Sequence, residues 1–214
     1  MKLVALCVSL PKFVPDRRGA IETGIFKTPA PGPLWLGRTH LDGDGQADLV
    51  NHGGVDKAAY AYPAVHYAAW NAELHADLPY GQFGENFTVE GLDEDTVHVG
   101  DRFRIGAAEV EATQPRIPCF KLGIRMGSAA FPKRFLQSER SGFYLRVVQE
   151  GLVAAGDPIV RTHSDPAGLS IRAVQRLMYA AGGEDAAWRA GLVRAIAIPG
   201  LSESWRAEFR TQLK

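Results

Sequence analysis

The sequence predicts a mainly β domain, built as a barrel or a sandwich, over residues 1–164 and a small three-helix domain over residues 165–214. Two observations predict the β domain: short apolar runs alternate with turn residues, and 23 glycines and 13 prolines supply many turns. A third observation marks the boundary, because the pattern becomes helical after the dipeptide Asp165-Pro166.

Several short strands account for the β domain. The first strand is expected in residues 1–11, MKLVALCVSLP, and residues 97–113 alternate apolar and polar side chains around two turns. Residues 143–148 and 153–162 are rich in β-branched and aromatic residues. Residues 11–34 contain four internal prolines, so we expect a long loop there that is either disordered or functional.

Helices are few in the β domain and dominate the C-terminal one. Pro63 opens a predicted helix through Ala76, with an apolar stripe that includes Val65 and Trp70, and a second short helix covers residues 132–138. The three C-terminal helices are expected as follows: one capped by Ser170 and reaching about Ala181, one from Glu184 to Ile196, and one capped by Ser202.

Charge and composition exclude several classes of protein. The chain has 24 basic and 24 acidic side chains, which argues against binding of nucleic acid or anionic membrane through bulk charge. The alternative of a DNA-reading helix-turn-helix tail is weakened by the net charge of only about +2 over residues 165–214. No apolar run approaches the ~20 residues that cross a bilayer. We expect a cytoplasmic protein, because Cys7 and Cys119 lie far apart and form no disulfide framework.

Positive charge is concentrated in residues 114–146, which hold seven basic residues and the single acid Glu139. Arginine and lysine match phosphate and carboxylate groups, so this stretch predicts a site for an anionic small molecule. The alternative is a solvated basic face without a ligand.

Cys119 lies inside this stretch, in the segment PRIPCFK. The two prolines favour a rigid loop after a strand, and we expect Arg116 and Lys121 to lower the pKa of the thiol. A thiolate is both a nucleophile and a soft metal ligand, whereas a cysteine can also simply fill a core. For Cys7, which alternates within an apolar strand, we expect burial.

A second candidate cluster is His52-Gly53-Gly54 with Lys57. Paired glycines permit positive φ and a close backbone approach to an anion, although a plain turn explains the pattern equally well. The turn that contains Glu85 and Asn86 likewise has two interpretations: its side chains contact a ligand, or they only form the turn. His66 and His75 are expected on the helix surface, and the six histidines show no zinc-binding spacing.

Five segments in order give the chain a resemblance to a known family: HGGVDKAAYAYP, FGENFTVEGL, EDTVHVGD, PRIPCFKLGIRMG and SGFYLRVVQEG. Together they resemble the MOSC domain family, and more narrowly its YiiM-type members, in which a three-helix domain follows the MOSC β-barrel.

This resemblance implies binding of the molybdenum cofactor (molybdopterin) and reduction of small N-hydroxylated compounds, such as hydroxylamino-purine bases, to amines. It implies that Cys119 is the molybdenum ligand and catalytic centre, where it tunes the metal and does not attack substrate. An external reductase would supply electrons, and the tail would dock it or form a homodimer. The candidate cofactor-binding residues are His52, Gly53, Gly54, Lys57, Asn86, Arg116, Lys121 and Arg146.

Two further functions stay open at this point. In other MOSC proteins the cysteine is thought to carry sulfur as a persulfide, and a reactive Cys119 would suit that role equally well. A non-catalytic barrel that binds an anionic metabolite is the other alternative.

Overall fold

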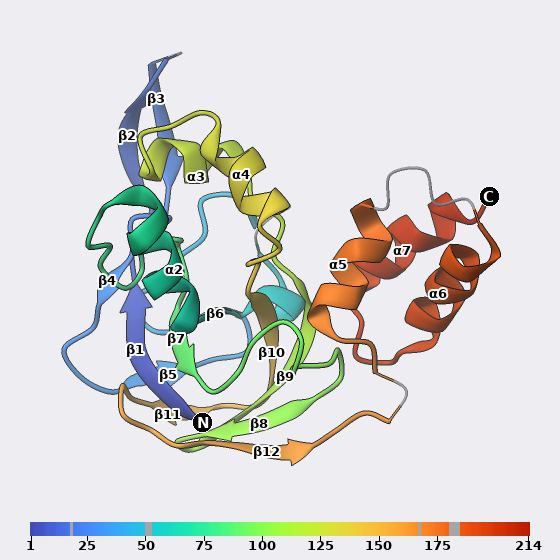
Figure 1. The fold of residues 1–214 in the computed structure, drawn as a ribbon. Coiled ribbons are helices and arrows are strands. Elements are labelled where there is room, and N and C mark those ends of the chain that lie inside the picture. Colours follow the sequence, from blue (N-terminus) through green and yellow to red (C-terminus); the bar gives the residue numbers. More distant parts are fainter. Residues whose placement is uncertain (18, 50–52, 167, 180–184) are drawn as a thin grey trace.

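The computed structural model describes residues 1–17, 19–49, 53–166, 168–179 and 185–214. Figure 1 shows a β-rich part that carries the N-terminus and a group of three helices beside it that carries the C-terminus. The predicted fold class, a mainly β unit with few helices followed by a three-helix region, is confirmed.

An eight-stranded sheet forms the β-rich part, with the order β12-β8-β9-β10-β6-β7-β1-β4. Neighbouring strands are antiparallel except β6 and β7, which are parallel. Leu3 N donates to Asp157 O at 2.9 Å and Ile159 N to Met1 O at 2.9 Å, so β1 closes the sheet against the start of β12. The bounds are β1 Lys2–Val8, β4 Thr28–Pro29, β6 Ala59–Pro63, β7 Phe87–Glu90, β8 Arg102–Ile105, β9 Ala108–Pro115, β10 Phe143–Gln149 and β12 Ile159–His163.

The burial of each strand follows from what covers its two faces. In β8, Phe103 and Ile105 point into the closed sheet, while Arg102 and Arg104, which alternate with them, are exposed. Strand β9 is buried along almost its whole length, because its second face is covered by the C-terminal helices. Leu192 and Trp205 of these helices belong to the same hydrophobic core as the strands.

Side-chain caps fix the starts of the three C-terminal helices, α5 Ile171–Tyr179, α6 Ala186–Ala197 and α7 Glu203–Gln212. Ser170 accepts a hydrogen bond from Ala173 N at 3.2 Å and Ser202 from Trp205 N at 3.4 Å, so both predicted serine caps are confirmed. Asp185 caps α6 by accepting from Trp188 N at 2.7 Å. The predicted bounds Ala181 and Glu184 lie outside the described residues.

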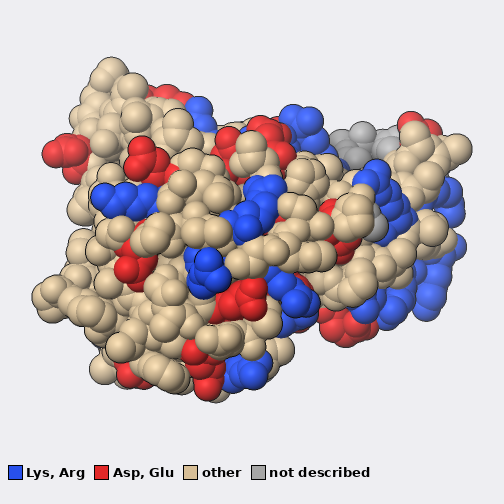
Figure 2. Space-filling model, turned by 90° about the horizontal axis from the view of Figure 1, so that it is seen from below, with Lys and Arg blue, Asp and Glu red and all other residues tan. Residues whose placement is uncertain are grey.

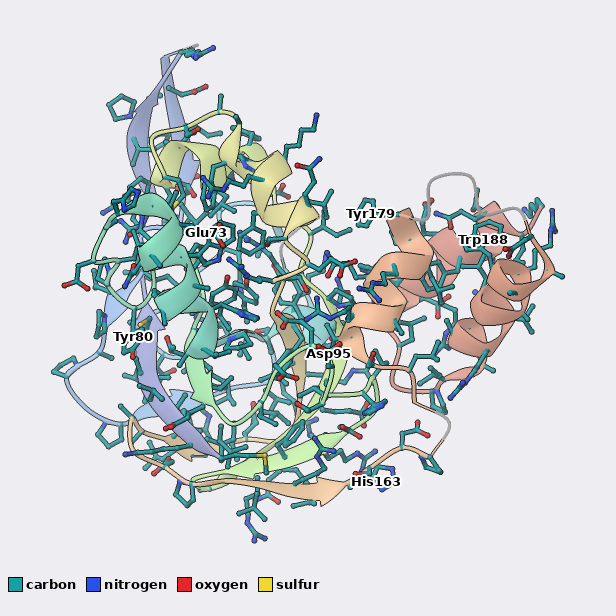
Figure 3. The ribbon with its side chains drawn as sticks, viewed as in Figure 1. Glu73, Tyr80, Asp95, His163, Tyr179 and Trp188 are labelled. Carbon is teal, nitrogen blue, oxygen red and sulfur yellow. The ribbon has the colours of Figure 1, made fainter. Side chains whose placement is uncertain are left out.

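An ionic joint ties α5 to the β-rich part. Arg172 pairs with Asp95 at 2.7 Å and with Glu139 at 3.3 Å. Figure 3 labels Asp95 at this junction. The pKa of Glu139 is lowered, chiefly by its hydrogen bond with Arg176 of the same helix.

Three helices cover one end of the β-rich part: α2 Val65–Leu74, α3 Phe120–Arg125 and α4 Phe131–Gln137. The predicted helix is confirmed, but it begins at Val65, and Pro63 is the last residue of β6. Of the predicted apolar stripe, Trp70 is buried as expected, whereas Val65 is exposed and His66 and Tyr67 are buried in its place. His66 was expected on the surface and is instead buried, with its Nε2 2.7 Å from Glu94 Oε2. His75 is exposed, as predicted.

The expected loop over residues 11–34 is also corrected. Strands β2 Lys12–Asp16 and β3 Gly19–Thr23 form a hairpin that projects from the molecule (Figure 1), and β5 Leu34–Leu36 pairs with β11 Gly151–Val153. Pro15 faces Ala20 within the hairpin. A proline is tolerated here because a two-stranded hairpin leaves one side of each strand unpaired.

Surface charge is mixed on the face shown in Figure 2, where basic and acidic side chains alternate and lysines and arginines gather toward the helical end. This agrees with the zero net charge of the chain. Within the described ranges, every helix is too short or too polar to span a lipid bilayer.

Where the helical tail meets the sheet, two glycines touch, and this contact predicts a sensitive position. A Cβ added to Gly200 would lie 2.5 Å from the Cα of Gly100. We expect Gly200→Ala to lower the free energy of unfolding by roughly 1–3 kcal/mol through overpacking. Urea denaturation measures this loss.

The matched control is Gly32→Ala, where an added Cβ meets no atom within 4 Å. A Gly200→Ala protein as stable as this control would show that the backbones of the two parts do not pack closely.

Candidate functional site

A cleft of about 100 Å³ opens at one end of the sheet, and we call it the cationic cleft. It brings together five residues that the sequence singled out: Lys57, Asn86, Arg116, Cys119 and Lys121. The sequence did not indicate several of its other lining residues, among them Lys27, Asp44, Tyr60 and Tyr144.

Arg116 is the central cation of the cleft. It follows the last residue of β9, is 6% exposed, and its guanidinium lies 5.2 Å from the centre of the Tyr60 ring and 5.1 Å from that of Phe135. Its Nη1 has no hydrogen-bond partner within the described structure. Burial alone would lower the pKa of Arg116, but electrostatic interactions with Tyr60 and Tyr144 raise it overall. The guanidinium therefore stays charged.

Cys119 lies at the rim of the same cleft, half-buried, in the predicted position after strand β9. It is the residue before α3, and its carbonyl accepts from Leu122 N at 3.0 Å. Its thiol interacts electrostatically with Arg116. Lys121 follows in the first turn of α3 and also lines the cleft.

The second cysteine has no such setting. Cys7 is fully buried in β1, and burial raises the pKa of its thiol to about 12. The expectation that Cys7 fills the core is confirmed, and the two thiols differ sharply in environment.

The floor of the cleft is a buried polar cluster that sequence patterns did not reveal. Lys27 forms an ion pair with Asp44, and burial lowers the pKa of Lys27. Asn86 donates to Asp44 Oδ2 at 2.9 Å and to Cys7 O at 3.2 Å, and it accepts from Tyr60 N at 3.1 Å. Asn86 thus fixes the cleft wall with its own hydrogen bonds. Lys27 and Asp44 are 17 residues apart and share no motif, so only the prediction of a functional loop over 11–34 pointed near them.

The glycine-rich turn shapes the approach to Lys57. Gly54 has a φ of 96°, and a Cβ on Gly53 would come within 2.8 Å of Leu49 O, so one glycine supplies the turn and the other the close backbone approach. Lys57 ends the short 3-10 helix η1 Val55–Lys57 and is half-buried. Burial lowers its pKa, against the opposing effect of Asp56. His52 lies outside the described residues, and neither glycine lines the cleft.

Most basic residues of the stretch 114–146 do not line the cationic cleft, and several form ion pairs outside it. Arg146 pairs with Asp56 at 2.6 Å and with Glu111 at 3.1 Å, away from the cleft. Arg134 and Arg140 both bind Glu73, which Figure 3 labels on α2. Within this stretch, only Arg116 and Lys121 among the basic residues line the cationic cleft. The site is therefore built from two cations of the stretch together with Lys27 and Lys57.

A larger groove of about 550 Å³ adjoins the cleft, and we call it the tail groove. It lies between the segment 117–120 on one side and helices α5 and α7 on the other. It shares Asp48, Lys57, Cys119 and Tyr144 with the cationic cleft, so the side chain of Cys119 borders both.

The chemistry of these groups suits an anion next to a thiol ligand. A buried guanidinium with an unsatisfied nitrogen favours a phosphate or carboxylate, and a thiolate favours a soft metal. Across the described residues, no group of three His, Cys, Asp or Glu side chains is placed to hold a metal ion. A metal bound at Cys119 would therefore need ligands beyond the described side chains.

Comparison with known proteins accounts for both parts of the chain. Residues 48–160 match the MOSC domain family, and residues 169–214 match the family described as YiiM-like, 3-alpha helix domain. The chain is 43% identical over 189 residues to the uncharacterized protein YflK of Bacillus subtilis, covering 88% of this chain and 84% of YflK. It is 32% identical to a protein named reductase from Gibberella moniliformis, over 76% of this chain but only 29% of that protein.

Solved structures agree. The crystal structure of YiiM from Geobacillus stearothermophilus superposes with a TM-score of 0.83 at 33% identity, covering 100% of this chain and 99% of that one. YiiM from Escherichia coli gives a TM-score of 0.76 at 24% identity, covering 100% and 92%, which shows the shared fold. The chain therefore belongs to the MOSC domain family, as a YiiM-type member in which a three-helix domain follows the MOSC domain.

Proposed function

We propose that this protein is an oxidoreductase that binds the molybdenum cofactor and reduces N-hydroxylated compounds to amines. The observation that carries the proposal is the buried guanidinium of Arg116, whose Nη1 has no hydrogen-bond partner among the described residues, beside the thiol of Cys119. The similarity to a protein named reductase supports an oxidoreductase in general terms.

The residues present fit the cofactor. Its phosphate is an anion that would offer acceptors to Arg116 Nη1, and Lys57 and Lys121 add positive charge around the same cleft, whereas the charge of Lys27 is paired with Asp44. Its dithiolene would leave molybdenum in need of a further soft ligand, which Cys119 at the rim supplies. Asn86, by contrast, spends its side-chain hydrogen bonds on the protein and would hold the cleft in shape.

The overall reaction is R–NHOH + 2e⁻ + 2H⁺ → R–NH₂ + H₂O. When bound, the cofactor supplies the electron pair. The protein must supply a proton near Cys119, and we assign that role to Lys57 Nζ. This lysine lines both the cleft and the groove, and burial lowers its pKa, which makes its ammonium a stronger acid.

Electrons must come from outside, because the sequence has no flavin, haem or iron–sulfur motif. We propose an external reductase as the donor and a cytoplasmic setting, in which thiols such as Cys7 and Cys119 stay reduced.

Metal content tests the proposal. We expect protein expressed with molybdate and purified without oxygen to hold near-stoichiometric molybdenum and pterin, and we expect Cys119→Ala and Arg116→Met to lose most of it. The matched control is Arg134→Met, which removes a basic residue of the same stretch that lies on α4 outside the cleft. Molybdenum is measured by mass spectrometry and pterin as its fluorescent oxidation product.

Two results would contradict this function. If Arg134→Met lost as much metal as Arg116→Met, the cleft would have no specific role in binding the cofactor. Wild-type protein without metal or pterin, but with cyanide-releasable sulfur, would favour the persulfide carrier.

Thiol reactivity gives a second prediction. At pH 7 the native protein should react with one equivalent of iodoacetamide, at Cys119, because a thiol with a pKa of about 12 leaves almost no thiolate at Cys7. Cys119→Ala should then react with none, while unfolded wild type reacts with two. Modification of Cys7 in the native protein at a rate like that of Cys119 would refute the assignment of Cys119 as the accessible thiol.

A further inference from the structure

We propose that Cys119 of the metal-free protein is a site of reversible thiolation by a small peptide thiol, whose carboxylate binds in the cationic cleft while the rest of the peptide lies in the tail groove. This modification goes beyond the proposed function and needs no cofactor. It rests on the place of Cys119 between two cavities and on a buried polar atom without a partner in each of them.

The position of Cys119 allows exchange with a disulfide. Its side chain lines both the cationic cleft and the tail groove and is only half-buried, whereas Cys7 is fully buried in β1. Exchange between a thiol and a disulfide requires access to the attacking sulfur. Cys119 meets this requirement, and a ligand bonded to its sulfur has one cavity on each side.

The cleft side selects a carboxylate. Arg116 lines the cleft with Cys119, is 6% exposed, and its Nη1 has no hydrogen-bond partner among the described residues. A guanidinium matches the geometry of a carboxylate, and Lys121, in the first turn of α3, adds a second positive charge to the same cleft. The cleft has a volume of about 100 Å³ and the groove about 550 Å³, so a small charged group fits the first and the bulk of a peptide the second.

The groove side selects hydrogen-bond donors. Gln114 lines the groove, is 3% exposed, and its Oε1 has no partner in the described part of the chain. The carboxylate of Glu208, exposed on α7, lines the same groove. Amide N–H groups and an ammonium are donors that these oxygens accept. A peptide thiol carries such donors together with a carboxylate, so its two ends match the two cavities that meet at Cys119.

The modification is a thiol–disulfide exchange, Cys119–SH + RSSR → Cys119–S–SR + RSH. Cys119 Sγ loses its proton to solvent and attacks one sulfur of the disulfide. The S–S bond of the disulfide breaks, a new S–S bond forms to Cys119, and the second sulfur leaves with the electron pair and takes up a proton. Cys119 is thereby oxidised, and one half of the disulfide is reduced.

The mixed disulfide has no internal route of release. The chain holds one further cysteine, Cys7, and burial raises the pKa of its thiol to about 12. Cys7 therefore does not attack a disulfide at Cys119 while the protein is folded. The modification persists until an external thiol reduces it, and for that time the sulfur of Cys119 is withheld from any metal.

The test compares two disulfides with metal-free protein: glutathione disulfide, which carries carboxylates, and hydroxyethyl disulfide, which is neutral. Each rate is divided by the rate of the same disulfide with N-acetylcysteamine, a small neutral thiol. We expect wild type to react about tenfold faster with glutathione disulfide, because the cations of the cleft attract its carboxylate. Mass spectrometry of the intact protein counts the mixed disulfides, and peptide mapping assigns them to Cys119.

The cleft end is tested in two independent ways. Arg116→Met should abolish the preference for glutathione disulfide, whereas Arg134→Met, the matched control on α4 outside the cleft, should keep it. Inorganic phosphate added to wild type should slow the reaction with glutathione disulfide and leave that with hydroxyethyl disulfide unchanged. This second measurement needs no substitution, so it holds even if a variant folds poorly.

The groove end is tested from α7. Ser204 is exposed and lines the tail groove, so Ser204→Trp should slow the reaction with glutathione disulfide severalfold and leave that with hydroxyethyl disulfide unchanged. Ala207→Trp is the matched control, because Ala207 is exposed on α7 and lines neither cavity.

Four results would overturn the inference. Equal normalised rates with the two disulfides in wild type would show that the site does not recognise a peptide thiol. A preference that survives both Arg116→Met and added phosphate would place the carboxylate outside the cleft, and equal slowing by Ser204→Trp and Ala207→Trp would place the peptide outside the groove. A mixed disulfide at Cys7 would assign the wrong thiol. All of these measurements use metal-free protein, so their outcome is independent of whether wild type binds molybdenum.

Discussion

The structure of the site depends on one constraint: a guanidinium is buried without a carboxylate partner. Burying a charge costs several kcal/mol unless it is compensated, and here two aromatic rings and Tyr144 compensate it only in part. Three parts of the fold hold Arg116 in this position. Strand β9 delivers it, Asn86 fixes the Tyr60 backbone beneath it, and Phe135 of α4 closes over it. A cation buried in this way at the wall of a cleft is placed to bind an anion.

The two parts of the chain contribute differently to this site. The closed sheet supplies the cations, the thiol and their rigid frame, whereas the helical tail supplies the far wall of the tail groove. Because β9 is packed on one face by the sheet's core and on the other by the tail, the position of Cys119 just beyond β9 is tied to both. Tail and sheet share one hydrophobic core and the ion pair between Arg172 and Asp95, so both packing and charge hold the two sides of the groove together.

Sequence patterns predicted the fold class, the strands near the N-terminus and over residues 97–162, and the two serine-capped helices, because these depend on local alternation and on residues next to each other. They failed where distant residues decide the outcome. His66 is buried because its ring nitrogen forms a hydrogen bond with the carboxylate of Glu94, 28 positions away. Pro15 is tolerated in a strand because one edge of that strand has no hydrogen-bonded neighbour. In the site, Cys119 and Arg116 were evident from their charged, proline-bounded loop. Lys27 and Asp44 were not evident, since only folding brings them together. Several basic residues of the stretch 114–146 do not reach the site, because they form ion pairs with acids such as Glu73 and Glu111.

Arg116 is kept for a ligand and not for stability. This role is tested by the free energy of unfolding of metal-free wild type and of Arg116→Met, measured by urea denaturation in a phosphate-free buffer. We expect the variant, in which an apolar side chain replaces a charge that is compensated only in part, to be as stable as wild type or more stable. We also expect added phosphate to stabilise wild type alone. An Arg116→Met protein destabilised by about 3 kcal/mol or more, with equal phosphate responses in both proteins, would contradict the claim and make Arg116 a structural residue.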